Sequence, residues 1–462
     1  MRGVGNYWRG FLELAWAPKA APESWFGLCI AGVMILRPRF VFLTVALGLQ
    51  LLGCSGQPEE CAGKSQFFAG SIEISGAKGS GRVEDLECVQ VVTGSVTISD
   101  PGLRSLEPLR TLVHVMGDMT ITAPAVPSLH GLEQLQEVGG ALRVADLKDL
   151  QSLEGLEGLK KLDGALTLSN LPKVASLEAL GALKAIGGSL SVSQLESVTT
   201  LEGLGAIGRI GGDLSIASND ALTDLDELRS LSAIDGTFTL SDNPALVSAS
   251  IPSGDPAFFP SVGGDIVIFN NDSLKTATRF GVPAERAGSC DDRGLIDGIF
   301  VAENDSLETV ELPVVRNANV SVANNDRLST VSSPEPGGSA CMFLLSSLPR
   351  LTKVSVAYWL MDTLSIVDTG LTTLDGFEQS GAKCRVNVSQ NAALTDVGAL
   401  SHGSKVASMF DISQNPALAS CQVQAMLDAF PAPTGQCGKS GPAPGTRVVS
   451  IKNNDDSAAC QE

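Results

Sequence analysis

A short alternation of apolar and small polar residues recurs along most of the chain. The N-terminal copies each begin with glycine, as in "GSIEIS" at 70, "GSVTIS" at 94, "GALTLS" at 164 and "GTFTLS" at 236. From Gly70 the steps between successive copies are 24, 23, 23, 24, 24, 24 and 24 residues. Alternation with a period of two predicts a strand with one buried face. A fixed repeat of this length predicts a solenoid with one coil per repeat.

The C-terminal copies end in asparagine and follow the pattern apolar-x-apolar-x-x-Asn-x-x-Leu, as in "LSDNPAL" at 240–246 and "ISQNPAL" at 412–418. Because Asn tolerates the left-handed backbone conformation and bonds to backbone groups, we expect each Asn to turn the chain after a strand. Stacked Asn side chains can also bond to one another along the axis. The Gly before each strand is expected to supply another corner with positive φ. The eight positions of this turn ladder are Asn219, Asn243, Asn271, Asn304, Asn325, Asn391, Asn415 and Asn454.

Leucines three residues apart follow each strand, as in "LTDLDELRSLSAI" at 222–234. This spacing suits short straight segments and tight corners, and it lacks the 3,4 alternation of a long amphipathic helix. One coil cannot bury its own apolar residues, so stacked coils must form a continuous core. The copies, with a degenerate one at "MFLLSS" (342–347), number about 16. At roughly 4.8 Å per strand they predict a rod on the order of 70 Å long.

The register differs from that of a leucine-rich repeat, which reads Leu-x-x-Leu-x-Leu-x-x-Asn. Here Ile210, Leu214, Ile216 and Asn219 fall at offsets 0, 4, 6 and 9, because the glycine corner adds a residue. The segment "ECVQVVTGSVTIS" (87–99), a Cys and an apolar run before Gly-x-apolar-x-Ile, resembles the entry of the receptor L domain. That family includes modules of the insulin-receptor and EGF-receptor ectodomains and many bacterial surface proteins. The segment "SLEPLRTLVHVMGDMTI" (105–121) continues in the same style.

The resemblance covers roughly 61–460, with departures at the insertions 275–297 and 419–446, and "NPALASC…NNDDSAAC" resembles the closing cap of the bacterial members. It implies an all-β, right-handed parallel β-helix of about 24-residue coils, like a leucine-rich repeat, with short helical segments in the caps. The expected organisation is a mis-called start (1–33), a lipoprotein signal peptide (34–54), an N-terminal cap and first coil (55–93), an L-domain-like β-helix (94–250) and irregular coils with a disulfide-bonded cap (251–462). One continuous body and two segments meeting near 250–263 both fit.

The segment "MILRPRFVFLTVALGLQLLGC" (34–54) has the features of an export signal. Arg37 and Arg39 give it a charged start, and the apolar run from Val41 to Leu52 is too short to span a bilayer comfortably. The final "LLGC" resembles a bacterial lipobox, which implies cleavage before Cys54 and lipidation of that residue. Ser55 favours sorting to the outer membrane. We therefore expect an exported protein that is lipid-anchored at the cell surface; an ordinary signal peptide with an incidental Cys is the alternative.

Eight cysteines remain after Cys29 and Cys54 are set aside, an even number that favours disulfides in an exported chain. Cys61 and Cys88 flank the first coil, so we expect them to pair. The second expected pair is Cys421–Cys460, because each lies nine residues after an equivalent strand Ile, Ile412 or Ile451. The remaining four allow three pairings, which the sequence leaves open; they are Cys290, Cys341, Cys384 and Cys437.

Composition and motifs argue against most chemistry. A formal charge of −19 repels phosphate backbones, so no nucleic-acid partner is expected. The "GLGAIG" at 203–208 matches a dinucleotide motif but follows no strand, which makes it an ordinary corner. No GxSxG, HExxH or catalytic Cys–His pattern occurs, and no cofactor is expected. Asp272, Asp305 and Asp326 follow the ladder asparagines and form a weak candidate Ca²⁺ site, although Asn-Asp is also good turn chemistry, which we favour.

The outward strand positions are mostly Ser, Thr and Ala, as at Ser189, Ser191 and Ser193. We expect a non-catalytic recognition or adhesion scaffold that presents this face to an unknown protein or glycan. A polysaccharide-degrading β-helix enzyme is the first alternative, and it would gather Asp and Arg on one sheet face; Asp118, Asp213 and Asp265 are instead separated by intervening coils. The second alternative is a purely structural protein of the cell envelope. The adjacent pair Tyr358-Trp359 is either a contact site or an edge anchor.

Overall fold

The computed structural model describes residues 61–76, 79–251, 260–278, 282–283, 298–313, 315–333, 339–356, 360–378, 382–402, 407–430 and 446–455. The chain divides into two units, Met1–Ala62 and Gly63–Glu462. In the first unit the structure describes Cys61 and Ala62 alone. The second unit contains every described strand and helix.

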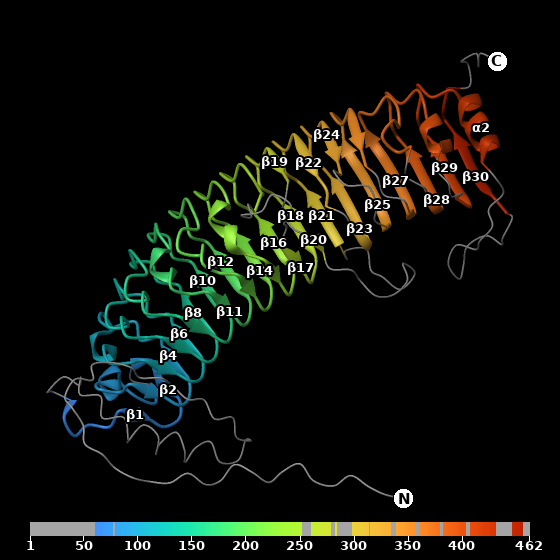
Figure 1. Ribbon diagram of the computed structural model, residues 1–462. Coiled ribbons are helices and arrows are strands. Elements are labelled where there is room, and N and C mark those ends of the chain that lie inside the picture. The colour runs from blue at the N-terminus through green and yellow to red at the C-terminus, as the bar shows by residue number, and fades with distance from the viewer. Residues whose placement is uncertain are drawn as a thin grey trace, which may run out of the picture. The chain divides into compact units, whose positions relative to one another are not determined.

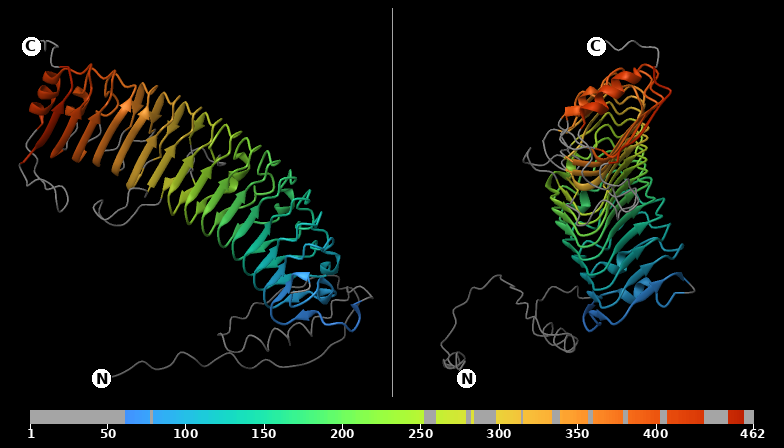
Figure 2. Two further views of the ribbon diagram at one scale, coloured as in Figure 1. Left: turned by 180° about the vertical axis from the view of Figure 1, so that it is seen from behind. Right: turned by 90° about the vertical axis from the view of Figure 1, so that its right-hand side faces the viewer.

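The second unit is an all-β parallel solenoid whose rungs stack one after another along a curved body (Figures 1 and 2). Leu166 pairs in parallel with Leu190, and Leu190 with Leu214, so neighbouring rungs lie 24 residues apart in sequence. The predicted fold class and repeat length are therefore confirmed.

One sheet, here called the long sheet, runs the length of the unit and contains 16 strands among the described residues. Consecutive rungs supply its neighbouring strands, as expected from the repeat. The strands are β2 (Ile72–Ile74), β4 (Val96–Ile98), β6 (Met119–Ile121), β8 (Leu142–Ala145), β10 (Leu166–Ser169), β12 (Leu190–Ser193), β14 (Leu214–Ala217), β16 (Phe238–Ser241), β18 (Ile266–Phe269), β21 (Gly298–Ala302), β23 (Arg316–Ala323), β25 (Ser339–Leu348), β27 (Leu360–Thr369), β28 (Ala382–Ser389), β29 (Met409–Ser413) and β30 (Val448–Lys452).

Two smaller parallel sheets complete the rungs, and the sequence pattern did not predict them. A ten-stranded sheet is formed by β1 (Phe67–Phe68), β3 (Val91–Val92), β5 (His114–Val115), β7 (Glu137–Val138), β9 (Lys161–Leu162), β11 (Ala185–Ile186), β13 (Arg209–Ile210), β15 (Ala233–Ile234), β17 (Ser261–Val262) and β20 (Val282–Pro283). A four-stranded sheet is formed by β19 (Thr276–Ala277), β22 (Thr309–Glu311), β24 (Thr330–Ser332) and β26 (Lys353–Ser355).

Helix is confined to short turns and a cap. The leucines three apart form corners, several of them single 3-10 turns, which suit that spacing because side chains at i and i+3 align. The described helices are η3 (Val83–Leu86), η4 (Glu107–Leu109), η5 (Glu178–Leu180), η6 (Asp226–Ser230), η8 (Gly398–His402) and α2 (Ser420–Ala429). The α2 helix falls inside the predicted insertion 419–446 and buries Val423, Met426 and Leu427. No described helix combines the length and apolar character needed to cross a membrane.

The core is a continuous stack of aliphatic side chains. Inward strand residues such as Leu166 and Leu168, and corner leucines such as Leu171 and Leu177, are fully buried. Each buried Leu contributes roughly 1.5–3 kcal/mol relative to exposure, so the contacts between rungs are the main source of stability.

The eight predicted turn-ladder asparagines are buried and bonded along the axis. The Asn243 Nδ2 donates to Asn271 Oδ1 at 3.2 Å, and the Asn271 Nδ2 donates to Asn304 Oδ1 at 3.1 Å. Each side chain also donates to a backbone carbonyl of the preceding rung, as from Asn271 Nδ2 to Leu240 O at 3.1 Å. Every Asn thereby satisfies buried backbone groups that the turn would otherwise leave without partners.

The left-handed residue of this corner is not the ladder asparagine, which corrects our expectation. Positive φ belongs to the residue immediately before it, such as Ser218 (57°), Asp242 (57°) and Asn270 (55°). These residues take the turn at the surface, and the following Asn is thereby free to point inward. Two residues are needed because one takes the left-handed conformation at the surface and the next directs its amide inward into the ladder.

The repeated glycine before each strand is also not generally a positive-φ corner. Gly70 has a φ of 93°, but the equivalent Gly94 and Gly164 are not in the left-handed region. A Cβ on Gly164 would lie 2.4 Å from the carbonyl carbon of Gly140 on the previous rung. Close approach of neighbouring rungs, not backbone conformation, excludes a side chain there.

The residue after this glycine links the rungs by side-chain bonds to backbone N–H groups. The Asp118 N–H donates to Ser95 Oγ at 3.0 Å, and the Asp118 Oδ1 in turn accepts from the Ala141 N–H at 2.8 Å. Asp213 accepts in the same way from the Thr237 N–H, at 2.8 Å. These aspartates therefore hold the coils together.

Candidate recognition surface

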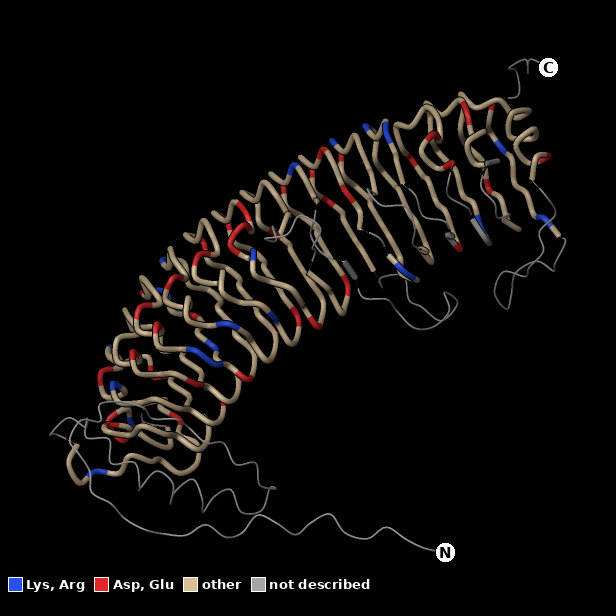
Figure 3. Tube along the Cα trace, viewed as in Figure 1, with Lys and Arg blue, Asp and Glu red and all other residues tan. Residues whose placement is uncertain are grey.

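The outward face of the long sheet is polar and uncharged over most of its N-terminal half. One row of paired residues crosses successive strands, and it reads Glu73, Thr97, Thr120, Arg143, Thr167, Ser191, Ser215 and Thr239. Figure 3 shows that acidic and basic residues gather mainly at the turns, with few on these strands. The predicted Ser/Thr-rich face is thus present in this half.

The same face gains apolar residues at β18, β21 and β25, among polar ones such as Ser321 and Ser365, and the repeat pattern did not predict them. Val267 pairs with Phe300, and Leu344 lies two strands further along the same row. These outward apolar residues are visible in the sequence, because the alternation of apolar and polar residues is lost in "IVIF" (266–269), "GIFVA" (298–302) and "CMFLL" (341–345). Strands with apolar residues on both faces are normal where both faces are covered.

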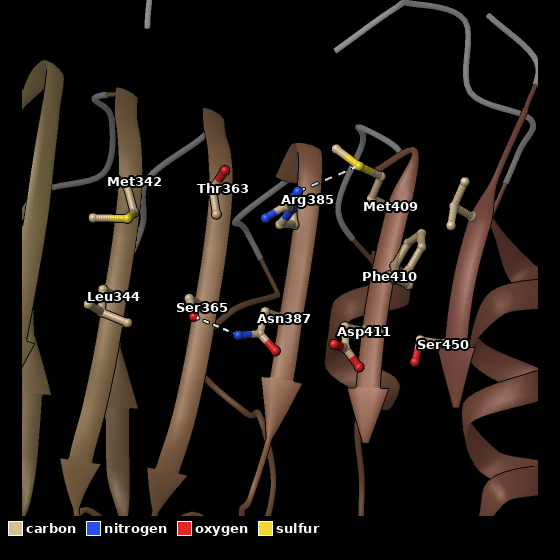
Figure 4. Close-up of a pocket in the computed structure, with 11 residues that line it drawn as sticks. Met342, Leu344, Thr363, Ser365, Arg385, Asn387, Met409, Phe410, Asp411 and Ser450 are labelled. Atoms are coloured by element: carbon tan, nitrogen blue, oxygen red, sulfur yellow. Dashed lines mark hydrogen bonds between the residues drawn. The ribbon is translucent and has the colours of Figure 1, made fainter. Parts of the chain in front are cut away.

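A groove of about 500 Å³ lies on this part of the sheet, across β25, β27, β28, β29 and β30 (Figure 4). Two rows of five residues line it. The upper row is Met342, Thr363, Arg385, Met409 and Val448, and the lower row is Leu344, Ser365, Asn387, Asp411 and Ser450. The groove residues thus come from five consecutive strands, and strand pairing fixes their order.

The polar side chains of the groove are partly bonded to one another. The Asn387 Nδ2 donates to Ser365 Oγ at 3.1 Å, which fixes the amide against the neighbouring strand. The Asp411 Oδ1 accepts from Ser413 Oγ at 2.8 Å. Figure 4 shows Asn387 and Asp411 on adjacent strands in the same row.

Arg385 is the only cation among the lining residues. Its guanidinium donates to Met409 Sδ at 3.8 Å, and within the described part of the chain it forms no ion pair. A thioether is a weak acceptor. Arg385 is exposed, so an exogenous acceptor could reach it.

An acidic column follows the η5 corner, away from the groove. Glu178 lies 24 residues before Glu202, and repulsion from the Glu178 carboxylate, with a hydrogen bond to it, raises the pKa of Glu202. Glu227 adds to the repulsion. The stacking of identical coils therefore brings like charges together at the surface.

The candidate Ca²⁺ residues Asp272, Asp305 and Asp326 are all exposed at their turns. Across the described residues, no group of three or more His, Cys, Asp or Glu side chains is placed to hold a metal ion. Calcium binding at this edge stays a prediction.

Disulfide bonds are present at Cys61, Cys88, Cys341, Cys384 and Cys421. Cys460, the expected partner of Cys421, lies outside the described residues, as do Cys290 and Cys437. The pairings therefore stay predictions. The lipidation residue Cys54 and the Tyr358-Trp359 pair also lie outside the described residues.

No protein-family model matches the chain, and no curated protein matches its sequence. Among solved structures, the chain is similar to an internalin from Listeria monocytogenes, with 13% identity, a TM-score of 0.27 and coverage of 81% of this chain and 84% of that chain. The leucine-rich repeat domain of APL1 gives 12% identity, a TM-score of 0.32 and coverage of 83% and 97%. A leucine-rich repeat protein from Bacteroides thetaiotaomicron has 12% identity and a TM-score of 0.26, and the match covers 81% of this chain and 51% of that chain. Because these TM-scores are low, the fold assignment is based on the strand pairing within this chain and not on the comparisons.

Proposed function

We propose that this protein is a non-catalytic recognition scaffold, lipid-anchored at a bacterial cell surface, that binds its partner on the outward face of the long sheet. The observation that carries the proposal is the groove across β25–β30, where apolar residues, hydrogen-bonding groups and one guanidinium share an open face. Concave surfaces with a few placed polar groups are the usual form of a binding site. Membership of the receptor L domain family belongs to the same proposal, and rests on the residues quoted for it.

A polysaccharide-degrading enzyme is the rival function, because Arg385 and Asp411 share the groove. Glycoside hydrolysis generally uses two carboxylates that flank the scissile bond. Asp411 is the single carboxylate among the groove-lining residues. Asp118 and Asp213 accept backbone N–H bonds between rungs. The residues therefore support binding better than catalysis.

The proposal is tested by capturing partners from envelope extract on immobilised protein of residues 55–462. Leu344→Arg places a bulky charge in the groove, and Asp220→Arg places the same residue at an exposed turn outside it. We expect Leu344→Arg to reduce capture at least tenfold and Asp220→Arg to leave it unchanged. Equal capture by the two variants would show that the groove is not the recognition surface.

A further inference from the structure

We propose that the groove binds an extended peptide whose acidic side chain pairs with Arg385 while neighbouring apolar side chains contact the methionines. This inference rests on the proposed function, since it specifies the ligand of the same surface. Three features of the groove argue for it: its length, a guanidinium that forms no ion pair within the described residues, and its apolar ends.

The groove has the length of a short peptide. Its two rows cross five strands, and strands in a sheet lie about 4.8 Å apart, so the rows extend roughly 19 Å. An extended chain rises about 3.3 Å per residue. Roughly six residues of an extended peptide therefore cover both rows.

The Arg385 guanidinium favours a carboxylate as its ligand group. Arg385 has a sulfur atom as its hydrogen-bond acceptor and no ion pair within the described residues, although the chain carries 51 acidic residues. A guanidinium matches a carboxylate with two parallel hydrogen bonds. A ligand carboxylate would give Arg385 the partner that the rest of the described chain does not supply.

The net charge of −19 works against an acidic ligand at long range, so the pairing must be local. Screening at physiological salt limits charge interactions between exposed groups to about 8 Å. The apolar contacts must then provide the remaining affinity, and Asp411, on the strand next to Arg385, can accept a peptide N–H.

The apolar side chains lie on both sides of Arg385. Met342 and Leu344 come from β25, and Met409 and Val448 from β29 and β30. Val448 is 52% exposed, an unusual value for a large aliphatic residue in this protein. Methionine adapts its shape to different apolar partners, which suits a surface that receives side chains of a ligand.

A glycan fits these residues less well than a peptide. Sugar rings typically stack on exposed aromatic faces, and Phe410, the one aromatic residue of the groove lining, is 2% exposed. The groove offers thioether and aliphatic groups instead. We therefore assign the site to a peptide and keep an acidic glycan as an outcome of the test.

The test uses a positional library of fluorescent hexapeptides with Glu, Gln or Lys at a fixed central position and Leu, Met or Val beside it. Binding to the protein of residues 55–462 is measured by fluorescence anisotropy. We expect Glu peptides to bind about tenfold more tightly than matched Gln peptides, and Lys peptides to bind most weakly. A bidentate charge pair of about 1.4 kcal/mol corresponds to that factor.

Variants connect the preference to Arg385. Arg385→Gln should remove the difference between Glu and Gln peptides, and Arg385→Lys should keep part of it. Arg143→Gln is the matched control, since Arg143 lies on the outward face of the same sheet and pairs with Asp146. It should keep the full preference, and unchanged melting temperatures verify folding of all three.

Two results would overturn the inference: no preference for Glu anywhere in the library, or displacement of every bound peptide by a sulfated oligosaccharide that itself binds more tightly. Either result leaves the proposed function intact if Leu344→Arg still reduces capture from the envelope extract at least tenfold. If Leu344→Arg and Asp220→Arg captured partners equally, the proposed function would be wrong, and the peptide preference could still be measured.

Discussion

Asn271 concentrates five side-chain hydrogen bonds in one buried corner. Its Oδ1 accepts from the backbone N–H and the Nδ2 of Asn243. Its Nδ2 donates to Leu240 O, Phe269 O and Asn304 Oδ1. The side chain is 0% exposed, so water cannot replace these bonds when they are removed.

We expect Asn271→Ala to destabilise the protein by about 3 kcal/mol, because a buried donor or acceptor without a partner costs about 1–3 kcal/mol. The neighbouring Asp272 is exposed, and Asp272→Ala should change the free energy of unfolding by less than about 0.5 kcal/mol. Urea unfolding followed by circular dichroism measures both. A similar loss for the two variants would mean that the ladder contributes no more than the surface turn.

Glycines of this protein differ in what a side chain would meet. A Cβ at Gly164 would lie 2.4 Å from Gly140 C, whereas the nearest atom to a Cβ at Gly208 is 3.9 Å away. Gly164→Ala should therefore cost about 2 kcal/mol through overpacking between rungs. Gly208→Ala should leave the free energy of unfolding unchanged or raise it by about 0.5 kcal/mol, because alanine lowers the conformational entropy of the unfolded chain. Thermal unfolding of the pair checks the difference, and equal melting temperatures would contradict it.

At the scale of the element, charged side chains gather mainly at the corners, with a few on the strands, such as Arg143, Arg385 and Asp411. Repetition of one coil places Glu178 and Glu202 in successive rungs, and the repulsion raises the pKa of Glu202. A carboxylate with a raised pKa in the folded state binds protons more tightly there than in the unfolded chain. The repulsion is thus fully present above the folded pKa, and it is relieved as the pH falls toward the ordinary value of 4.5.

We expect Glu202→Gln to raise the melting temperature slightly at pH 7 and to lose this effect as the pH falls below the ordinary carboxyl pKa of 4.5. The gain at pH 7 should shrink at 1 M salt, because the residue is fully exposed and its interactions are screened. Calorimetric scans between pH 3 and 8 test this. A gain that persists at low pH would point to packing instead of charge.

Sequence periodicity was sufficient for the strands of the long sheet and insufficient for the rest of each rung. Strands such as "LSIA" (214–217) alternate over four residues and repeat at a fixed step, which gives two independent signals. The two-residue strands, such as Arg209–Ile210, are too short to show any period. Their pairing is imposed by the stacking of the neighbouring rungs.

The groove could have been predicted only in part. Loss of alternation in "CMFLL" (341–345) marks apolar residues on the outward face, and that pattern is visible in the sequence. The proximity of Met342, Arg385 and Asp411 is not, because the steps between successive strands differ in length and the pairing of β27 with β28 includes a register shift. Only the folded sheet determines which of these residues share a row.

At the scale of the molecule, the apolar core continues where the asparagine ladder stops. Asn325 lies next to the rung of β25, whose corner carries the buried Leu348 in place of an Asn. The ladder resumes where the Thr369 N–H donates to Asn391 Oδ1 at 3.0 Å. The solenoid therefore depends on aliphatic stacking throughout, and on amide bonding in two separate stretches.

The proposed lipid anchor would determine where the solenoid meets its partner, and it depends on Cys54 alone. If the "LLGC" segment is processed as proposed, Cys54 carries acyl chains that contribute roughly 0.8 kcal/mol per buried CH₂. Full-length protein expressed in a bacterium with an alkyne fatty acid should become labelled and partition into the detergent phase of Triton X-114. Cys54→Ser should lose the label and enter the aqueous phase, whereas Cys29→Ser should behave like the wild type. Labelling that survives Cys54→Ser, or wild-type protein that remains unlabelled, would remove the anchor from the proposal and leave the groove to act in an unanchored protein.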